Sequence, residues 1–372
     1  MKNRQAGLDR LRILSAYFVV GIHLFALLGD LGGSRGGSLF ANALVYALVF
    51  CAVDCFGLLS GWLGYREEKN SLRLKSLILL WLQFVFYRVF FLLLPALLHI
   101  ADPVSLTDIF LPVTKRVNWY MTAYFEMMLL APAINRIVSG LSRGVNAAVC
   151  LALILLTAVS TVLRAVMDCD PFLLGEGYNW MWLAALYFLG ASMRKHGWFS
   201  NTPAGHLRLR LLAALLLTAA WRWGMRSFFN ADTFPGNTEK IFYSYTSPTI
   251  LLASLCLLLL HARMDSVNAE RLIEKASSSA LGVFLLHTTV WNWLIAPCAG
   301  LLSPLPRSFA WLNVLLSALV ITMLCIPVDL ARAWLFRKLR VRALADRVQT
   351  YFVKLCGKIA QKAGRGNRGF PD

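Results

Sequence analysis

Residues 12–25 read RILSAYFVVGIHLF, an apolar run that is long enough to begin a membrane span yet carries Arg12 at one end and His23 near its middle. Eleven residues at about 100° each bring these two side chains back to the same helix face, about 16 Å apart along the axis. Because neither group is stable against acyl chains, this face is expected to point into a helix bundle. In a polar cavity an imidazole, with a reference pKa of about 6.5, could act as a general base. A structural histidine hydrogen-bonded between helices is the alternative.

The composition of the 372-residue chain predicts a polytopic membrane protein. Hydrophobic residues make up 58%, charged residues 15%, and the mean hydropathy is +0.61, which leaves too little polar surface for a soluble domain of this length. Apolar runs of about 20 residues, the length that crosses a ~30 Å hydrocarbon core, recur along the chain. We expect an all-α membrane bundle with about ten transmembrane helices, at residues 11–31, 41–63, 74–98, 118–138, 147–167, 178–195, 208–229, 242–262, 277–299 and 309–336.

Lys and Arg are distributed unevenly among the predicted connections. The N-terminus, the even-numbered connections and the C-terminal segment hold 28 of the 37, and the odd-numbered connections hold eight. The positive-inside rule therefore places both termini in the cytoplasm, which requires an even number of spans. The same rule explains the net charge of +18 without a nucleic-acid partner.

The chain divides into a membrane domain, residues 1–340, and a basic tail, residues 341–372. In the tail, Lys and Arg alternate with Leu, Val, Tyr and Phe at helical spacing, which predicts a helix lying on the anionic inner leaflet, with membrane lipid as its partner. The last ten or so residues are predicted to be disordered. No zinc spacing, Walker loop or GxGxxG occurs, so no metal is expected. Cys169 and Cys298 both fall near the outer face, and whether they pair is left open.

Ionisable residues inside the predicted spans are functional candidates, because burying them in lipid is costly. Besides His23 they are Asp54, Arg88, Glu126, His287 and Asp329. Glu126 could partner Arg88, and His287 has a structural role between helices as its alternative. Trp119 and Tyr124, at the outer mouth of the same span as Glu126, could stack on a sugar or belong only to the interfacial aromatic belt.

A second group of candidates lies at the cytoplasmic end of the second span. Ser60 offers a hydroxyl to a ligand, although a small residue there also serves helix packing. The stretch that follows brings four cations to the same membrane surface as Arg12: Arg66, Lys69, Arg73 and Lys75. They form a candidate docking patch for an anionic cofactor with phosphates, such as an acyl-CoA. Ordinary positive-inside charge is the alternative reading of this patch.

The stretch LDRLRILSAYFVVGIHLF, residues 8–25, resembles the start of the acyltransferase-3 family, integral membrane O-acyltransferases of bacteria, in which an arginine and a histidine are separated by ten residues in the first span. Five later segments are similar, in order, to segments of the branch that O-acetylates cell-surface polysaccharides. They are FGLLSGWLGYREEKNSLRLKSLILLWLQFVFY, WYMTAYFEMMLLAPAINRI, MWLAALYFLGASMRK, FYSYTSPTILLASLCLLLL and SSSALGVFLLHTTV. The resemblance covers roughly residues 7–338. The family's (R/K)xxR motif and nearby proline are missing from SLRLKSLILLWLQF, and Glu126 replaces a residue that is usually small or apolar.

The resemblance implies transfer of an acyl group, most often acetyl, from cytoplasmic acetyl-CoA to a carbohydrate hydroxyl, by a multi-pass protein of the bacterial cytoplasmic membrane. His23 and Arg12 would be the catalytic residues, with His23 as the general base or acyl carrier. The donor would dock at Arg12, Ser60, Arg66, Arg73 and Lys75. The acceptor would meet residues of the outer half, with Trp119, Tyr124, Glu126, Arg88 and His287 as candidates. The acceptor sugar, the acyl group and the oligomeric state are left open.

Two other classes of function compete with the enzyme. A transporter or permease of a glycan or small anion also fits the spans and buried charges, but the sequence lacks repeat symmetry and a pair of broken spans. A membrane scaffold or sensor would leave Arg12 and His23 unexplained.

Overall fold

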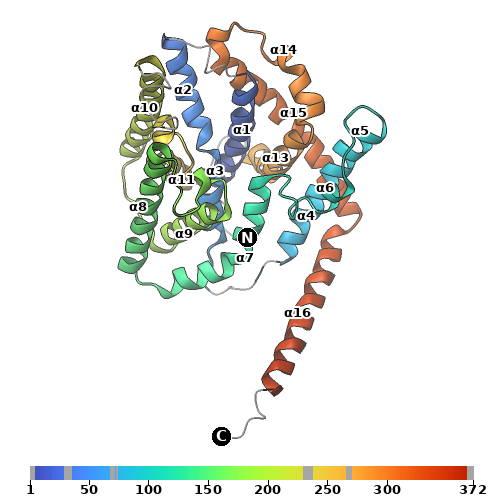
Figure 1. Cartoon of the computed structure of the whole chain (residues 1–372). Coiled ribbons are helices and arrows are strands. Elements are labelled where there is room, and N and C mark those ends of the chain that lie inside the picture. The colour runs from blue at the N-terminus through green and yellow to red at the C-terminus, as the bar shows by residue number, and fades with distance from the viewer. Residues whose placement is uncertain are drawn as a thin grey trace.

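The computed structural model describes residues 5–28, 36–67, 72, 74–228, 238–264 and 270–366, with side chains described as far as residue 355. Every regular element among these residues is a helix, as the sequence predicts (Figure 1). The α-helices are α1 (Ala6–Leu28), α2 (Gly36–Phe50), α3 (Ala52–Gly64), α4 (Leu74–Arg88), α5 (Leu94–Leu97), α6 (Leu106–Phe110), α7 (Trp119–Gly140), α8 (Arg143–Met167), α9 (Trp180–His196), α10 (Ala204–Phe228), α11 (Pro248–Ala262), α12 (Glu270–Ser278), α13 (Ala280–Thr289), α14 (Ala299–Leu302), α15 (Ala310–Lys338) and α16 (Val341–Gly366). Shorter 3₁₀ and π segments are η1 (Val89–Leu93), η2 (Gly175–Gly177), η3 (Thr238–Phe242), η4 (Trp291–Ile295), η5 (Ala296–Cys298) and η6 (Arg307–Phe309).

Five helices of the described chain are long and apolar enough to cross a membrane: Ala6–Leu28, Gly36–Gly64, Leu74–Leu97, Arg143–Met167 and Arg307–Lys338. A sixth span results if α13 and residues Trp291–Leu302, which meet at a 63° bend, are counted together. The helices that fall short are short or carry polar groups: α9 has 17 residues, and α7 contains Glu126 and Asn135. The helices support a multi-pass membrane protein, while ten spans and cytoplasmic termini remain predictions.

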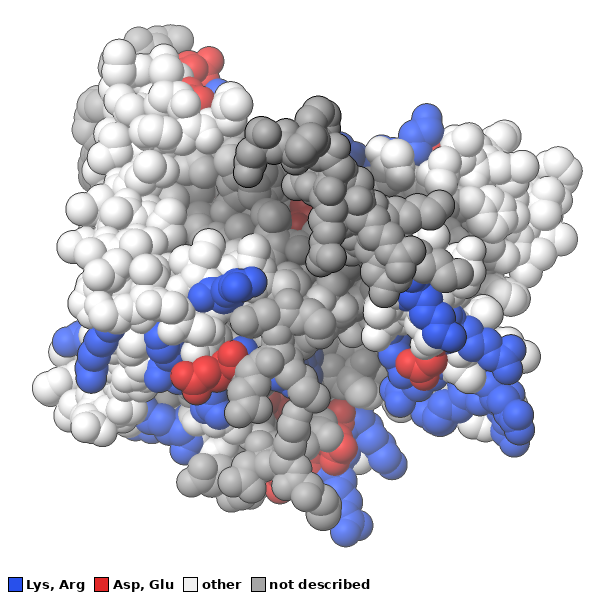
Figure 2. Space-filling model, turned by 90° about the horizontal axis from the view of Figure 1, so that it is seen from below, with Lys and Arg blue, Asp and Glu red and all other residues white. Residues whose placement is uncertain are grey.

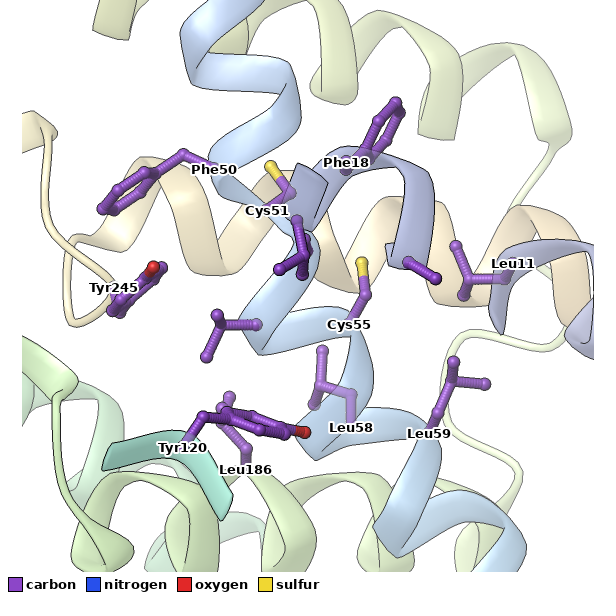
Figure 3. Close-up of a cluster of buried hydrophobic side chains, with 14 of the residues drawn as sticks. Leu11, Phe18, Phe50, Cys51, Cys55, Leu58, Leu59, Tyr120, Leu186 and Tyr245 are labelled. Atoms are coloured by element: carbon purple, nitrogen blue, oxygen red, sulfur yellow. The ribbon is translucent and has the colours of Figure 1, made fainter. Parts of the chain in front are cut away.

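Helices α3 and α9 pack closely against each other in the core, and glycine makes this possible. A Cβ added at Gly61 would lie 2.0 Å from the carbonyl oxygen of Tyr187, and one at Gly190 would lie 2.2 Å from that of Leu58. Each helix therefore places a glycine against the backbone of the other, as small residues do at membrane helix interfaces. Figure 3 shows side chains around this contact, among them Leu58, Leu186 and Tyr120.

We expect Gly61→Ala and Gly190→Ala each to destabilise the protein by about 1–3 kcal/mol, because an extra methyl overpacks a contact that has no room for it. Thermal unfolding of the purified protein in detergent measures the effect. Gly144→Ala is the matched control, because nothing lies within 4 Å of a Cβ added there. Equal melting temperatures for all three variants would show that the α3–α9 contact is looser than described.

Candidate functional site

A cavity of about 310 Å³ lies inside the bundle, and α1, α3, α7 and α13 supply most of its wall. Arg12 and His23 both line it, together with Val19 and Ile22 of α1. The structure thus places the two predicted residues on one cavity, at positions three helical turns apart. Ser15 and Ala16, which lie between Arg12 and Val19 on α1, are fully buried.

Arg12 is held in place by two polar neighbours. Its Nη1 donates to Asp9 Oδ1 at 3.2 Å and to Ser277 Oγ at 3.3 Å, and the Ser277 hydroxyl donates to Asp9 Oδ1 at 2.9 Å. The Arg12 side chain remains 35% exposed. A guanidinium that is oriented by a carboxylate but still accessible from the cavity is suited to binding an anionic or carbonyl-bearing ligand.

His23 is hydrogen-bonded to His287 of α13, with 2.7 Å between His23 Nδ1 and His287 Nε2. The other ring nitrogen of His287, Nδ1, lies 2.7 Å from the carbonyl oxygen of Val283. A carbonyl only accepts, so His287 Nδ1 carries a hydrogen, and in the neutral ring Nε2 is then an acceptor. His23 Nδ1 must therefore donate to it. This fixes the tautomer of His23, whose lone pair is on Nε2.

The Nε2 atom of His23 has no hydrogen-bond partner among the described residues, so its lone pair is available to a ligand in the cavity. If Nε2 takes up a proton, the bond to His287 becomes a bond from a charged donor, which is the stronger kind. His23 and His287 are thus arranged as a general base and the partner that orients it. The sequence predicts both histidines as candidates, but no local pattern pairs them, because they are 264 residues apart.

Helix α13, which carries His287, is fixed in position by a buried carboxylate on α15. Asp329 is 1% exposed, and its Oδ1 accepts hydrogen bonds from Gln83, Tyr87 and Arg332. A Cβ added at Gly282 of α13 would lie 2.2 Å from the Asp329 carboxyl carbon, so α13 rests directly on this group. Asp329 therefore connects α4, α13 and α15.

Aromatic side chains form a large part of the cavity wall. Trp119 and Tyr124, which the sequence predicts for acceptor binding, both line the cavity, and so do Tyr120, Tyr187 and Tyr245. Trp119 lies 5.9 Å from Tyr245, ring centroid to centroid. Tyr245 was not predicted, because it lies in the irregular segment between η3 and α11, where periodicity gives no signal. Aromatic rings with polar edges are suited to an acceptor that has both apolar faces and hydroxyl groups.

A family model described as an acyltransferase domain, that of the acyltransferase-3 family, matches residues 5–329. The chain belongs to this family. The match spans nearly the whole chain and includes four of the five apolar helices and most of the fifth, so the protein is a membrane acyltransferase by family, as the sequence resemblance indicates. Neither a curated protein nor a solved structure matches it significantly.

The predicted donor residues lie only partly at this cavity. Ser60 lines it, but its hydroxyl donates to the carbonyl of Phe56 at 2.7 Å, so its proton is not available for an oxyanion. Arg66 is exposed and not part of the cavity wall, and Arg73 and Lys69 lie outside the described residues. Lys75 pairs with Asp346 of the tail helix at 2.6 Å. A role for these cations in donor binding stays a prediction.

Three predicted acceptor residues are not part of the cavity wall: Arg88, Glu126 and His287, the last of which is fully buried and bonded to His23. Arg88 is buried beside Phe84, with its guanidinium carbon 5.9 Å from the ring centroid. Glu126 approaches Arg116 at 4.0 Å, so the expected pair with Arg88 is replaced by one with a cation close to the start of its own helix.

The thiols of Cys169 and Cys298 are both free. No group of three or more His, Cys, Asp and Glu in the described part of the chain could hold a metal ion.

We expect His287→Ala to lower the turnover number of acyl transfer roughly ten- to hundredfold, because His23 loses its orienting acceptor, and a hydrogen bond from a charged group is worth ~1.5–3 kcal/mol. His287→Gln should recover part of the rate, since an amide oxygen can accept from His23 Nδ1. Initial rates of thiol release from acyl-CoA, measured across pH, test this. A rate and pH profile like those of the unaltered protein in His287→Ala would show that His23 acts without this partner.

Proposed function

We propose that this chain is a membrane O-acyltransferase that moves an acyl group, acetyl in the first instance, from cytoplasmic acyl-CoA to a hydroxyl of a cell-surface carbohydrate. In this reaction His23 Nε2 takes the hydroxyl proton while the hydroxyl oxygen attacks the thioester carbonyl. The carbon–sulfur bond breaks, and the departing thiolate receives that proton from His23. The ester and the free thiol of CoA are the products.

The observation that carries this proposal is the lone pair on His23 Nε2. The bond from His287 to the Val283 carbonyl fixes the tautomers of both histidines, and His23 lines the same cavity as Arg12. Eleven residues along one helix put about 16 Å between the two Cα atoms. One thioester carbonyl cannot contact both side chains in that arrangement. Arg12 therefore suits another part of the donor, such as the pantetheine arm or a phosphate, with the acyl end at His23.

The proposed orientation puts the donor in the cytoplasm and the acceptor on the outer side, with ten spans and both termini inside. Figure 1 places the α7–α8 turn and the free end of α16 at one end of the bundle, and Figure 2 views that end, where Lys and Arg side chains gather. The positive-inside rule makes such an end cytoplasmic. Arg12, in the first two turns of α1, would then face the donor side, with His23 deeper.

The acceptor side of the proposal rests on the aromatic wall. Trp119, Tyr120, Tyr124 and Tyr245 line the cavity and offer ring faces and phenol hydroxyls. Sugars present apolar C–H faces and hydroxyl edges, and Tyr and Trp can contact both. A covalent route, in which His23 Nε2 itself attacks the thioester and then passes the acyl group on, uses the same lone pair.

We expect His23→Ala to lower acetyl transfer from acetyl-CoA to the surface glycan by about 10²–10⁴-fold, because general bases contribute that much. Acetyl-CoA should still stabilise this variant against heat. Arg12→Ala should instead raise the KM for acetyl-CoA and weaken that thermal shift. His206→Ala and Arg10→Ala, at exposed positions, are the matched controls.

The measurements are the acetyl content of the purified glycan and the melting temperature of the purified protein with acetyl-CoA. Full acetylation by His23→Ala would contradict the proposed base. An unaltered protein that neither binds nor cleaves acetyl-CoA would contradict the donor assignment.

A further inference from the structure

The tail helix α16 carries an apolar stripe that no other described element covers. Its members recur every three or four residues, as on one face of a helix: Leu344, Val348, Tyr351, Phe352 and Leu355. Each is between 42% and 70% exposed. A stripe of this width in water is unfavourable, and exposed apolar patches mark interaction surfaces.

Helix α16 contacts the bundle through the face next to the stripe, so the stripe itself stays uncovered. Ala345 is fully buried, and Asp346 pairs with Lys75 of α4 at 2.6 Å. Gln349 Oε1 accepts from the backbone N–H of Lys75 at 2.8 Å, which satisfies a donor at the start of α4. These contacts fix the first half of α16 beside the first turn of a candidate spanning helix. The second half extends beyond the bundle (Figure 1).

Basic residues surround the stripe. Arg337 and Lys338 end α15, Arg340 lies at the joint, and Arg342, Arg347 and Lys354 are exposed along α16. Asp346, the one acidic residue in this stretch, is neutralised by Lys75. A helix that exposes an apolar stripe and a net positive charge where a spanning helix enters the bilayer matches an anionic leaflet in both respects.

We propose that α16 is a binding element for anionic lipid headgroups. Its stripe contacts the leaflet next to the first turn of α4, and its Arg and Lys side chains bind the phosphates. The helix leaves the membrane surface at a slant, with Leu344 and Val348 nearest the acyl chains and Tyr351, Phe352 and Leu355 at headgroup level. This inference does not depend on the acyltransferase reaction.

The test is amide hydrogen exchange of residues 344–355 in the full-length protein, held as single copies in nanodiscs of phosphatidylcholine alone or with phosphatidylglycerol. We expect exchange to slow in the anionic discs and to recover in high salt. Arg347→Gln and Lys354→Gln should each weaken the lipid-dependent protection about fivefold, since one basic residue near an anionic surface contributes about that factor. Leu344→Ser with Phe352→Ser should abolish the protection. Val353→Ser should leave it unchanged, because Val353 is exposed and lies nine residues from Leu344, about 180° from it around α16.

Equal exchange in the two lipid compositions would overturn the proposal. So would lipid-dependent protection that survives in both the double serine variant and the two glutamine variants. Protection that appears only in discs with two copies would assign the stripe to a second copy of this chain, and the lipid proposal would then be wrong.

Discussion

The hydrogen bond between His23 Nδ1 and His287 Nε2 is the interaction on which the candidate site depends. It joins α1 to α13 and leaves one defined ring nitrogen for chemistry. A histidine without a fixed partner would rotate and exchange tautomers, and its lone pair would have no set direction. The Val283 carbonyl can only accept, so His287 Nδ1 donates to it. His287 Nε2 is then an acceptor and His23 Nδ1 a donor, which fixes the direction of the hydrogen bond between the two histidines.

Contacts elsewhere in the bundle keep α1 and α13, the two helices that this hydrogen bond joins, in position. Asp329 connects α13 to α4 and α15, and the close glycine contacts join α3 to α9 on another side of the cavity. Asp329 accepts from three donors, one of them the Arg332 guanidinium, so removing one partner would leave a buried polar group uncompensated. The polar groups that are expensive inside a membrane are thus concentrated where they position α13 and the cavity.

The all-helical fold class could be predicted from the sequence, and so could the part of the site on α1, which is Arg12 and His23. The spacing of Arg12 and His23 is a property of one helix, so a 3.6-residue period is enough to place both on one cavity. The pairing of His23 with His287 and of Lys75 with Asp346 joins segments hundreds of residues apart, and no local pattern encodes them. The Ser60 bond to Phe56 is different. It is an i to i−4 contact that serines in helices commonly make, so the helical period alone predicts it.

The most direct test of the central claim is a cryo-EM structure of the protein with a non-hydrolysable acyl-CoA analogue. The account predicts that the analogue's carbonyl carbon lies in the cavity beside His23, with room for one acceptor oxygen between them. That oxygen would be about 3 Å from His23 Nε2 and about 3–3.5 Å from the carbonyl carbon, with the rest of the donor passing Arg12. It also predicts that the His23–His287 contact is kept. An analogue bound with its acyl end away from His23, or outside the cavity that Arg12 and His23 share, would contradict the account.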